Sequence, residues 1–269
     1  MSFYEPLAGG RFRSTPHTRG PWDPAFQHAG PPAALLGRAL ERCDARRGMV
    51  LARLTYEILR PVPVAELEVT AGVVRPGRSV ELLEGELHAH GQPVMTVRAW
   101  RVLAASAPTA AADVPPPPRP AEATPPPGAL EGFGYGHAVE LRFAAGGWGE
   151  PGPATVWTRL RVPVVAGEEP TGLQRVLAVA DSGNGVSAVL PLTEWLFINP
   201  ELTVHVRRQP RGEWICLDAE TTIAEGGTGL ARSVLSDEDG PVAHGAQSLL
   251  VMPRARPVPA TPGERPRGR

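Results

Sequence analysis

Residues 202–223 read LTVHVRRQPRGEWICLDAETTI, and this stretch decides the fold of the chain. Apolar and polar residues alternate on both sides of its RRQPRG segment. Alternation with a period of two, punctuated by Gly and Pro, predicts two strands, Leu202–Arg207 and Trp214–Ile223. Two further alternating stretches, Gly229–Ser236 and Val242–Val251, extend the pattern. The last part of the chain is therefore predicted to form an antiparallel sheet.

A helix is predicted before each set of strands. Gly172–Ala180 (GLQRVLAVA) has apolar residues at helical spacing, and so does Pro32–Cys43 (PAALLGRALERC) near the start of the chain. The earlier helix is also followed by four predicted strands, which are Val50–Leu59, Leu67–Val74, Ser79–His88 and Val94–Leu103. One helix followed by long antiparallel strands predicts an α+β unit in which a curved sheet wraps around a central helix.

The two parts share a register. Three matches lie 148 positions apart: Thr55 and Thr203, Arg60 and Arg208, and the Pro-Val dipeptides that begin at 93 and 241. Three matches at one offset favour an internal duplication. Two unrelated α+β domains with a similar rhythm are the alternative. Two such units would cover each other's exposed sheet edges by joining edge to edge.

Composition divides the chain into four segments. Residues 104–128 are rich in Pro and Ala and contain few large apolar side chains, which predicts an extended linker. Residues 253–269 have a similar composition and are expected to be a disordered tail. The predicted folded units are therefore residues 1–103, a structural half, and residues 129–252, a catalytic half.

The bulk properties exclude several classes of protein. Among 269 residues, 27 basic and 28 acidic side chains give a net charge of -1, so nucleic acid is not an expected partner. Two cysteines, Cys43 and Cys216, build no disulfide framework, and His88 with His90 lacks a third metal ligand. Neither a signal peptide nor an apolar stretch of membrane-spanning length is found. A cytoplasmic protein without membrane insertion is expected.

Several motifs resemble a known family. They are WDPAFQHAGPPAALLGRAL in the first half, and LAVADSGNGVSAVLP, RRQPRGEWICLDAETTI and DGPVAHGAQSLLV in the second. Together they resemble the acyl-CoA thioesterases with a fused double hotdog fold, the type II bacterial enzymes and their relatives. The resemblance implies a double hotdog that hydrolyses acyl-CoA thioesters to a free acid and CoA without a cofactor.

The resemblance also implies a trio of water-activating residues in the second half. Asp181 would start the central helix and act as the base, while Asn199 and Gln247 would position the water. Relatives often have threonine where this chain has Asn199; an amide both donates and accepts hydrogen bonds, so it can still hold a water. Each residue also has a plain structural interpretation: Asp181 as a helix cap, Asn199 as a turn residue before Pro200, and Gln247 as a strand residue.

Further residues are expected around this trio. Backbone N–H groups of residues 182–184 would stabilise the oxyanion, and Gly183, Asn184 and Gly185 would let the backbone approach the substrate. His28 and Gly30 precede the first helix; they either form its starting turn or contact the ligand. Trp195 with Phe197 would line an acyl pocket. Arg207, Arg208 and Arg211 would bind CoA phosphates or form a solvated strand end.

The first half lacks this machinery, because the 148-residue offset places Ala33, Leu51 and Ala99 opposite the trio. Other reactions are disfavoured: no Gly-x-Ser-x-Gly elbow occurs, and the hydratase histidine position, five residues after Asp181, is Val186. A non-catalytic protein that binds acyl-CoA or fatty acyl groups remains the alternative function, and a scaffold without a pocket is a third. Acyl chain length, the choice between CoA and acyl carrier protein, and monomer or homodimer stay open.

Overall fold

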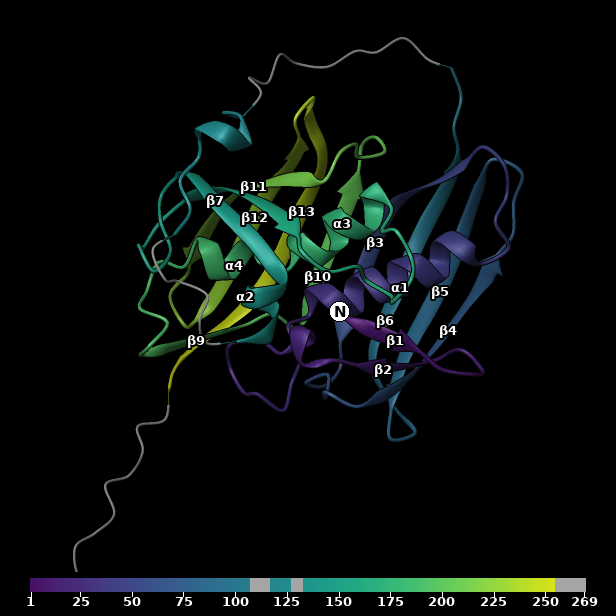
Figure 1. Cartoon of the computed structure of the whole chain (residues 1–269), viewed down its shortest axis with the longest axis horizontal. Coiled ribbons are helices and arrows are strands. Elements are labelled where there is room, and N and C mark those ends of the chain that lie inside the picture. Colours follow the sequence, from purple (N-terminus) through teal and green to yellow (C-terminus); the bar gives the residue numbers. More distant parts are fainter. Residues whose placement is uncertain (107–116, 127–132, 255–269) are drawn as a thin grey trace, which may run out of the picture.

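The computed structural model of the chain describes residues 1–106, 117–126 and 133–254, which form a 13-stranded antiparallel sheet with helices (Figure 1). The strands are β1 Tyr4–Pro6, β2 Arg11–Ser14, β3 Met49–Ile58, β4 Glu66–Arg75, β5 Val80–Ala89, β6 Gln92–Leu103, β7 Val139–Ala145, β8 Ala154–Leu160, β9 Trp195–Ile198, β10 Glu201–Val206, β11 Trp214–Ile223, β12 Thr228–Asp237 and β13 Gly240–Pro253. The α-helices are α1 Gly30–Arg42, α2 Gly134–Ala138, α3 Gly172–Ala180 and α4 Gly183–Val186, and 3₁₀ turns lie at Pro16–Thr18 and Pro120–Glu122.

The strand order shows how the two halves meet. It runs β1-β2-β4-β5-β6-β3-β10-β13-β12-β11-β8-β7, and β9 pairs with β13. Strands β1–β6 come from the first half and β7–β13 from the second, so the halves join where β3 pairs with β10. This edge-to-edge pairing leaves neither of the two joined strands with an exposed edge.

The 148-residue offset reappears in this pairing and in the backbone hydrogen bonds. Thr203 lies directly opposite Thr55, so the two matched positions face each other across the junction. The N–H groups of residues 59 and 60 donate to the Val94 carbonyl at 3.0 and 3.2 Å. Those of residues 207 and 208 donate to the Val242 carbonyl at 2.8 and 3.4 Å. The junction strands therefore follow a common pattern, although α1 and α3 begin at a different offset, at Gly30 and Gly172.

Helices α1 and α3 lie side by side in front of the strands in Figure 1. Helix α1 contacts β3–β6 and α3 contacts β8 and β10–β12. Four consecutive residues of α1, Ala33–Leu36, are fully buried, because the sheet covers one side of the helix and α3 another. Burial of each large aliphatic side chain such as Leu35 or Leu40 contributes about 1.5–3 kcal/mol.

Further contacts fasten the halves together. Arg38 on α1 donates two hydrogen bonds of 2.6 Å to Glu168, in the loop before α3. The Phe3 and Tyr4 N–H groups donate to the carbonyls of residues 163 and 164 in the second half. The start of the chain therefore packs against the second half as well as against its own.

The predicted elements agree with the structure to within about two residues, and α3 and β11 have the predicted bounds. Strands β1, β2, β7, β8 and β9 were not predicted. The segment expected to be an extended linker packs in part against the second half: the indole N–H of Trp157 donates to the Pro118 carbonyl at 2.6 Å, and Thr124 pairs with Phe143. The rest of that segment within 107–116 and 127–128, and the tail from 255, lie outside the described residues.

No helix in the described ranges combines the length and the apolar character needed to cross a bilayer.

Replacement of Gly30 by Ala tests the contact between α1 and α3. The added Cβ would lie 2.1 Å from the Ala178 carbonyl oxygen, which is backbone and cannot rotate away. We expect Gly30→Ala to lower the free energy of unfolding by about 1–3 kcal/mol in chemical denaturation. Gly72→Ala is the control, because its Cβ would meet no atom within 4 Å. Equal stability of both variants would contradict the close contact.

Candidate active site

Asp181 lies between the halves. Helix α3 ends at Ala180 and Asp181 is its C-cap, so the prediction that Asp181 starts a helix is wrong. Its carboxylate instead lies at the N-terminus of α1, in the other half, where the Ala29 N–H donates to Oδ2 at 3.0 Å. The first turn of α1 contains Pro31 and Pro32, which carry no N–H. The carboxylate thus supplies a negative charge at the positive end of a helix that has no side-chain cap of its own.

The structure brings the predicted trio together around this carboxylate. Asn199, between β9 and β10, donates from Nδ2 to Asp181 Oδ1 at 2.8 Å. Gln247 on β13 donates from Nε2 to Oδ1 at 3.1 Å and to the Asp181 carbonyl at 3.2 Å. Gln247 is 2% exposed, and its Oε1 accepts from the Asn184 N–H at 3.2 Å. Both amides therefore hold the aspartate directly.

His28 completes the constellation from the first half. Its Nδ1 accepts a hydrogen bond from the Gly30 N–H at 3.1 Å and lies 3.3 Å from Asp181 Oδ2. The imidazole stacks on Tyr135, with ring centroids 4.0 Å apart and ring planes 4° from parallel. The Tyr135 hydroxyl donates to the Ala178 carbonyl at 2.8 Å, which fixes the tyrosine. Sequence reasoning found neither contact of His28, because the partners lie more than 100 residues away and meet only through the fold.

Burial and charge act in opposite directions on this pair. Burial raises the pKa of Asp181, while His28 and the hydrogen bond from Asn199 lower it. Burial lowers the pKa of His28, while the Asp181 carboxylate raises it. Each ionised group is therefore disfavoured by desolvation and favoured by its partner, and the two groups titrate as a unit.

A cavity of about 840 Å³ opens beside this constellation. His28, Asp181, Asn184 and Asn199 form part of its polar wall, and both halves of the chain contribute to it. Most of the remaining lining is apolar, with aromatic side chains from both halves: Trp22, Phe26, Phe133, Trp148 and Phe197. Arg60 and Arg254 also line this cavity. An apolar cavity with a few convergent polar groups is the usual form of a small-molecule site.

Several predicted site residues have other positions. Trp195 does not line the cavity; it packs in a small cluster with Phe197 and Leu249. Gly30 and Gly183 do not line the cavity, and a Cβ on Gly183 would be 3.0 Å from Gln247 Oε1. Gly185 does line the cavity, and a Cβ there would meet no atom within 4 Å.

The expected oxyanion donors are largely committed elsewhere. The Ser182 N–H donates to the Val179 carbonyl at 2.9 Å, and the Asn184 N–H donates to Gln247. The Ser182 N–H is used in the turn from α3 into α4, and the Asn184 N–H is used by the Gln247 side chain, so both groups already have acceptors.

The arginines expected to bind CoA phosphates do not line the cavity either. Arg208 forms an ion pair with Asp237, the Arg211 N–H donates to the same carboxylate at 2.9 Å, and neither arginine lines the cavity. Arg207 does not line it either. These residues stabilise the strand end instead.

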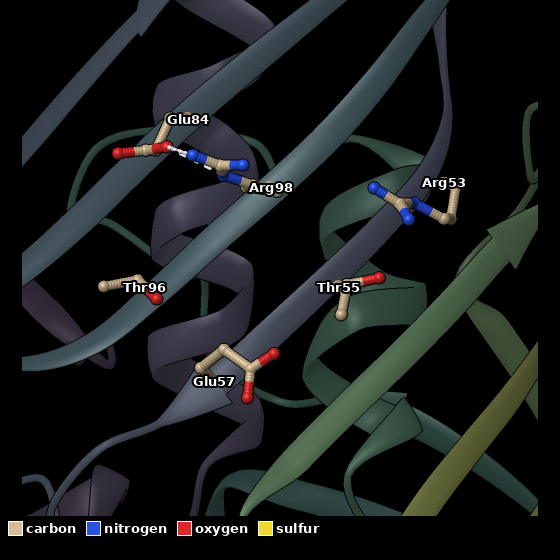
Figure 2. A pocket seen from close by; sticks show the side chains of 6 residues that line it. All are labelled: Arg53, Thr55, Glu57, Glu84, Thr96 and Arg98. Carbon is tan, nitrogen blue, oxygen red and sulfur yellow. Dashed lines mark hydrogen bonds and ion pairs between the residues drawn. The ribbon is translucent and has the colours of Figure 1, made fainter.

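A second, smaller cavity of about 430 Å³ lies on the other face of the sheet. Figure 2 shows its six lining side chains on strands in front of α1, with Arg98 hydrogen-bonded to Glu84. Its lining is charged and hydroxylic, from Arg53, Thr55, Glu57, Glu84, Thr96 and Arg98. None of the candidate catalytic residues lines this smaller cavity, whereas His28, Asp181 and Asn199 line the larger one.

No group of three His, Cys, Asp or Glu side chains in the described ranges is arranged to hold a metal ion.

Solved structures share the fold at low sequence identity. A conserved protein of unknown function with a hot dog fold from Alicyclobacillus acidocaldarius is 19% identical, with a TM-score of 0.73 over 93% of this chain and 96% of that chain. The acyl-CoA thioesterase II TesB2 from Mycobacterium marinum is 18% identical, with a TM-score of 0.68 over 96% of this chain and 97% of that chain. These likenesses establish a hotdog fold. No curated protein sequence matches the chain.

Family models identify both parts of the chain. The acyl-CoA thioesterase N-terminal domain matches residues 18–102, and the acyl-CoA thioesterase C-terminal domain matches residues 108–251. The second match alone covers more than half of the chain, and the two follow one another in the expected order. The chain therefore belongs to the acyl-CoA thioesterase family.

Proposed function

We propose that the chain is a double hotdog that hydrolyses acyl-CoA thioesters to a carboxylic acid and CoA, using a water activated at Asp181. The repeated hydrogen bonds just after β3 and β10, and the placement of α1 and α3 on their own strands, support the double arrangement. The family membership supports thioester hydrolysis in general.

One observation carries the catalytic part of the proposal. Asp181 is a 5% exposed carboxylate that reaches the wall of a mostly apolar cavity, and Asn199 and Gln247 hold it in place. A thioester carbonyl is already electrophilic, so the protein mainly has to position and partly deprotonate a water. The apolar lining suits an acyl chain, and no redox or metal chemistry is required for the reaction.

The two arginines that line the cavity suit the phosphates of CoA, the carrier of the acyl group. Arg254 donates from Nε to the Leu192 carbonyl at 2.9 Å, and its guanidinium lies 5.0 Å from the centre of the Trp22 ring. Arg60 donates to the Pro93 carbonyl at 2.8 Å. Both guanidiniums keep further N–H donors, which suit phosphate oxygens. We therefore assign them, in place of Arg207, Arg208 and Arg211, to the phosphates of CoA.

A non-catalytic acyl-binding protein is the second candidate. Asn199 favours it, because its Nδ2 is bonded to Asp181 and it has no hydroxyl that could rotate toward a water. The cavity does not fit the third interpretation, a scaffold without a pocket.

The free cysteines Cys43 and Cys216 suit a reducing compartment, so we propose a cytoplasmic location. The proposed acyl-CoA substrate gives the chain a role in lipid metabolism.

Thiol release from acyl-CoAs of increasing chain length, from acetyl to palmitoyl, tests the hydrolysis. We expect turnover, and we expect Asp181→Ala to lower kcat by about 10²–10⁴-fold, because the activating carboxylate is lost. Asp218→Asn is the matched control, since Asp218 is exposed on β11 and should leave kcat unchanged. Bound acyl-CoA without turnover in the wild-type chain would support the acyl-binding alternative, and full activity of Asp181→Ala would contradict the role of Asp181.

Arg254→Ala tests the phosphate contact. We expect the KM for acyl-CoA to rise about fivefold, which corresponds to about 1 kcal/mol for a solvent-accessible charge contact. The KM for the same acyl group on N-acetylcysteamine, which lacks phosphates, should stay the same. Arg211→Ala is the control and should change neither value. Equal effects of Arg254→Ala on both substrates would show that Arg254 does not recognise the phosphates.

A further inference from the structure

The backbone donors around Asp181 are already engaged. At the N-terminus of α1, the Ala29 N–H donates to Asp181, the Gly30 N–H donates to His28, and the next two residues are prolines. In the turn into α4, the N–H groups of residues 182 and 184–186 donate to other protein groups, and residue 183 does not line the cavity. A donor for the negative charge that develops on a thioester carbonyl must therefore come from a side chain.

The imidazole of His28 carries such a donor. Its Nδ1 accepts the Gly30 N–H at 3.1 Å, so a neutral ring holds its proton on Nε2. Burial lowers the pKa of His28, which favours the neutral ring, and a doubly protonated ring would carry the same Nε2 proton. The Gly30 N–H also lowers the pKa of Asp181, so one backbone donor serves both the imidazole and the carboxylate. Nε2 is a hydrogen-bond donor in either state of the ring.

This Nε2–H group is accessible from the cavity. His28 lines the cavity with a side chain that is 13% exposed. Across the described parts of the chain, no hydrogen bond involves Nε2, and Nε2 is not one of the buried polar atoms that lack a partner. Nδ1 faces Gly30 and Asp181, so Nε2, across the ring, faces away from them. Tyr135 stacks on the ring and fixes the plane in which this N–H donates.

The two amides around Asp181 do not offer the same donor. Asn199 lines the cavity, but its Nδ2 donates to Asp181 and to the Glu201 carbonyl, which uses both of its hydrogens. Gln247 does not line the cavity, and its Nε2 donates to the carboxylate and the carbonyl of Asp181. Of Asn199, Gln247 and His28, the histidine is the one that keeps a donor for a molecule in the cavity.

We propose that His28 Nε2–H donates to the carbonyl oxygen of the bound thioester and stabilises the oxyanion that forms from it. This inference rests on the proposed hydrolysis and adds the group that takes up the developing charge. A fixed donor in a mostly apolar cavity stabilises such a charge more than it would in water, and a neutral imidazole can polarise a carbonyl in this way. His28 then acts on the carbonyl oxygen, and Asp181 acts on the carbonyl carbon through the water.

The reaction balances with these two residues. The water oxygen forms a bond to the carbonyl carbon, Asp181 takes one of the water protons, and the carbonyl electron pair moves to the oxygen that faces Nε2–H. The electron pair then returns, the carbon–sulfur bond breaks, and Asp181 gives the proton to the leaving sulfur. The products are a carboxylic acid, which ionises in water, and the free thiol of CoA. His28 keeps its proton throughout.

His28→Phe and His28→Gln separate hydrogen-bond donation from packing. Phenylalanine keeps a flat ring that can stack on Tyr135 but has no N–H, so we expect kcat to fall by about 10²–10³-fold with little change in KM. Glutamine loses the ring but places an amide N–H near the position of Nε2, so it should retain a larger part of kcat than phenylalanine does. A residue that acted only by packing would give the reverse order. His244→Phe, at an exposed position on β13, is the control and should keep the wild-type kcat.

A bound carbonyl reports the hydrogen bond without any turnover. The probe is an acyl-CoA analogue in which a methylene group replaces the thioester sulfur, with an isotope label at the carbonyl carbon and the acyl chain that binds most tightly. Donation from Nε2–H lowers the stretching frequency of this carbonyl. Infrared difference spectra should therefore show a lower frequency on the wild-type chain and on His28→Gln than on His28→Phe. Proton–nitrogen NMR spectra of the histidine rings should show the proton of His28 on Nε2.

Several results would overturn the role of His28. They are equal stretching frequencies on the wild-type chain and His28→Phe, a His28→Phe variant with the wild-type kcat, and a ring protonated on Nδ1 alone. A wild-type chain that hydrolyses no acyl-CoA would instead overturn the proposed hydrolysis. The stretching frequency of the bound ketone would then still decide whether His28 donates to an acyl carbonyl, so the two proposals fail by different measurements.

Discussion

The pairing of β3 with β10 is the constraint on which the rest of the molecule depends. It converts two sheets into one, with Thr55 opposite Thr203 at the point where equivalent strands meet. With this register set, α1 and α3 lie against each other, and the N-terminus of α1 comes to the loop that follows α3. A shift by one residue would turn every side chain of the moved strand to the other face, so the register is strongly specified by the buried residues.

The candidate site is a product of that arrangement. The carboxylate and both amides come from the second half, while the helix end and the imidazole come from the first. Neither half holds a complete set of groups. The first half is therefore more than a structural partner: it supplies the Ala29 N–H that donates to Asp181 and the His28 imidazole at the cavity wall.

The central helices and the long strands could be predicted from the sequence, because the period of their apolar residues reflects burial on one face. Val139, Leu141 and Phe143 also alternate and are buried in β7, so this strand could have been recognised from the same pattern. The trio could be located by resemblance. The contact of His28 with Asp181 could not, because it depends on a register between β3 and β10 that no local pattern displays. The cavity's arginines were missed for the same reason.

For the proposed hydrolysis, Pro31 and Pro32 have a consequence for the release of product. They remove two of the donors that a helix N-terminus usually presents, and the Ala29 N–H is bonded to Asp181. The positive end of α1, which would otherwise attract any small anion, is thus already neutralised by a built-in carboxylate. A newly formed fatty acid anion would meet another negative charge there and no free backbone donor. The helix end that orders the site thereby favours departure of the acid over its retention.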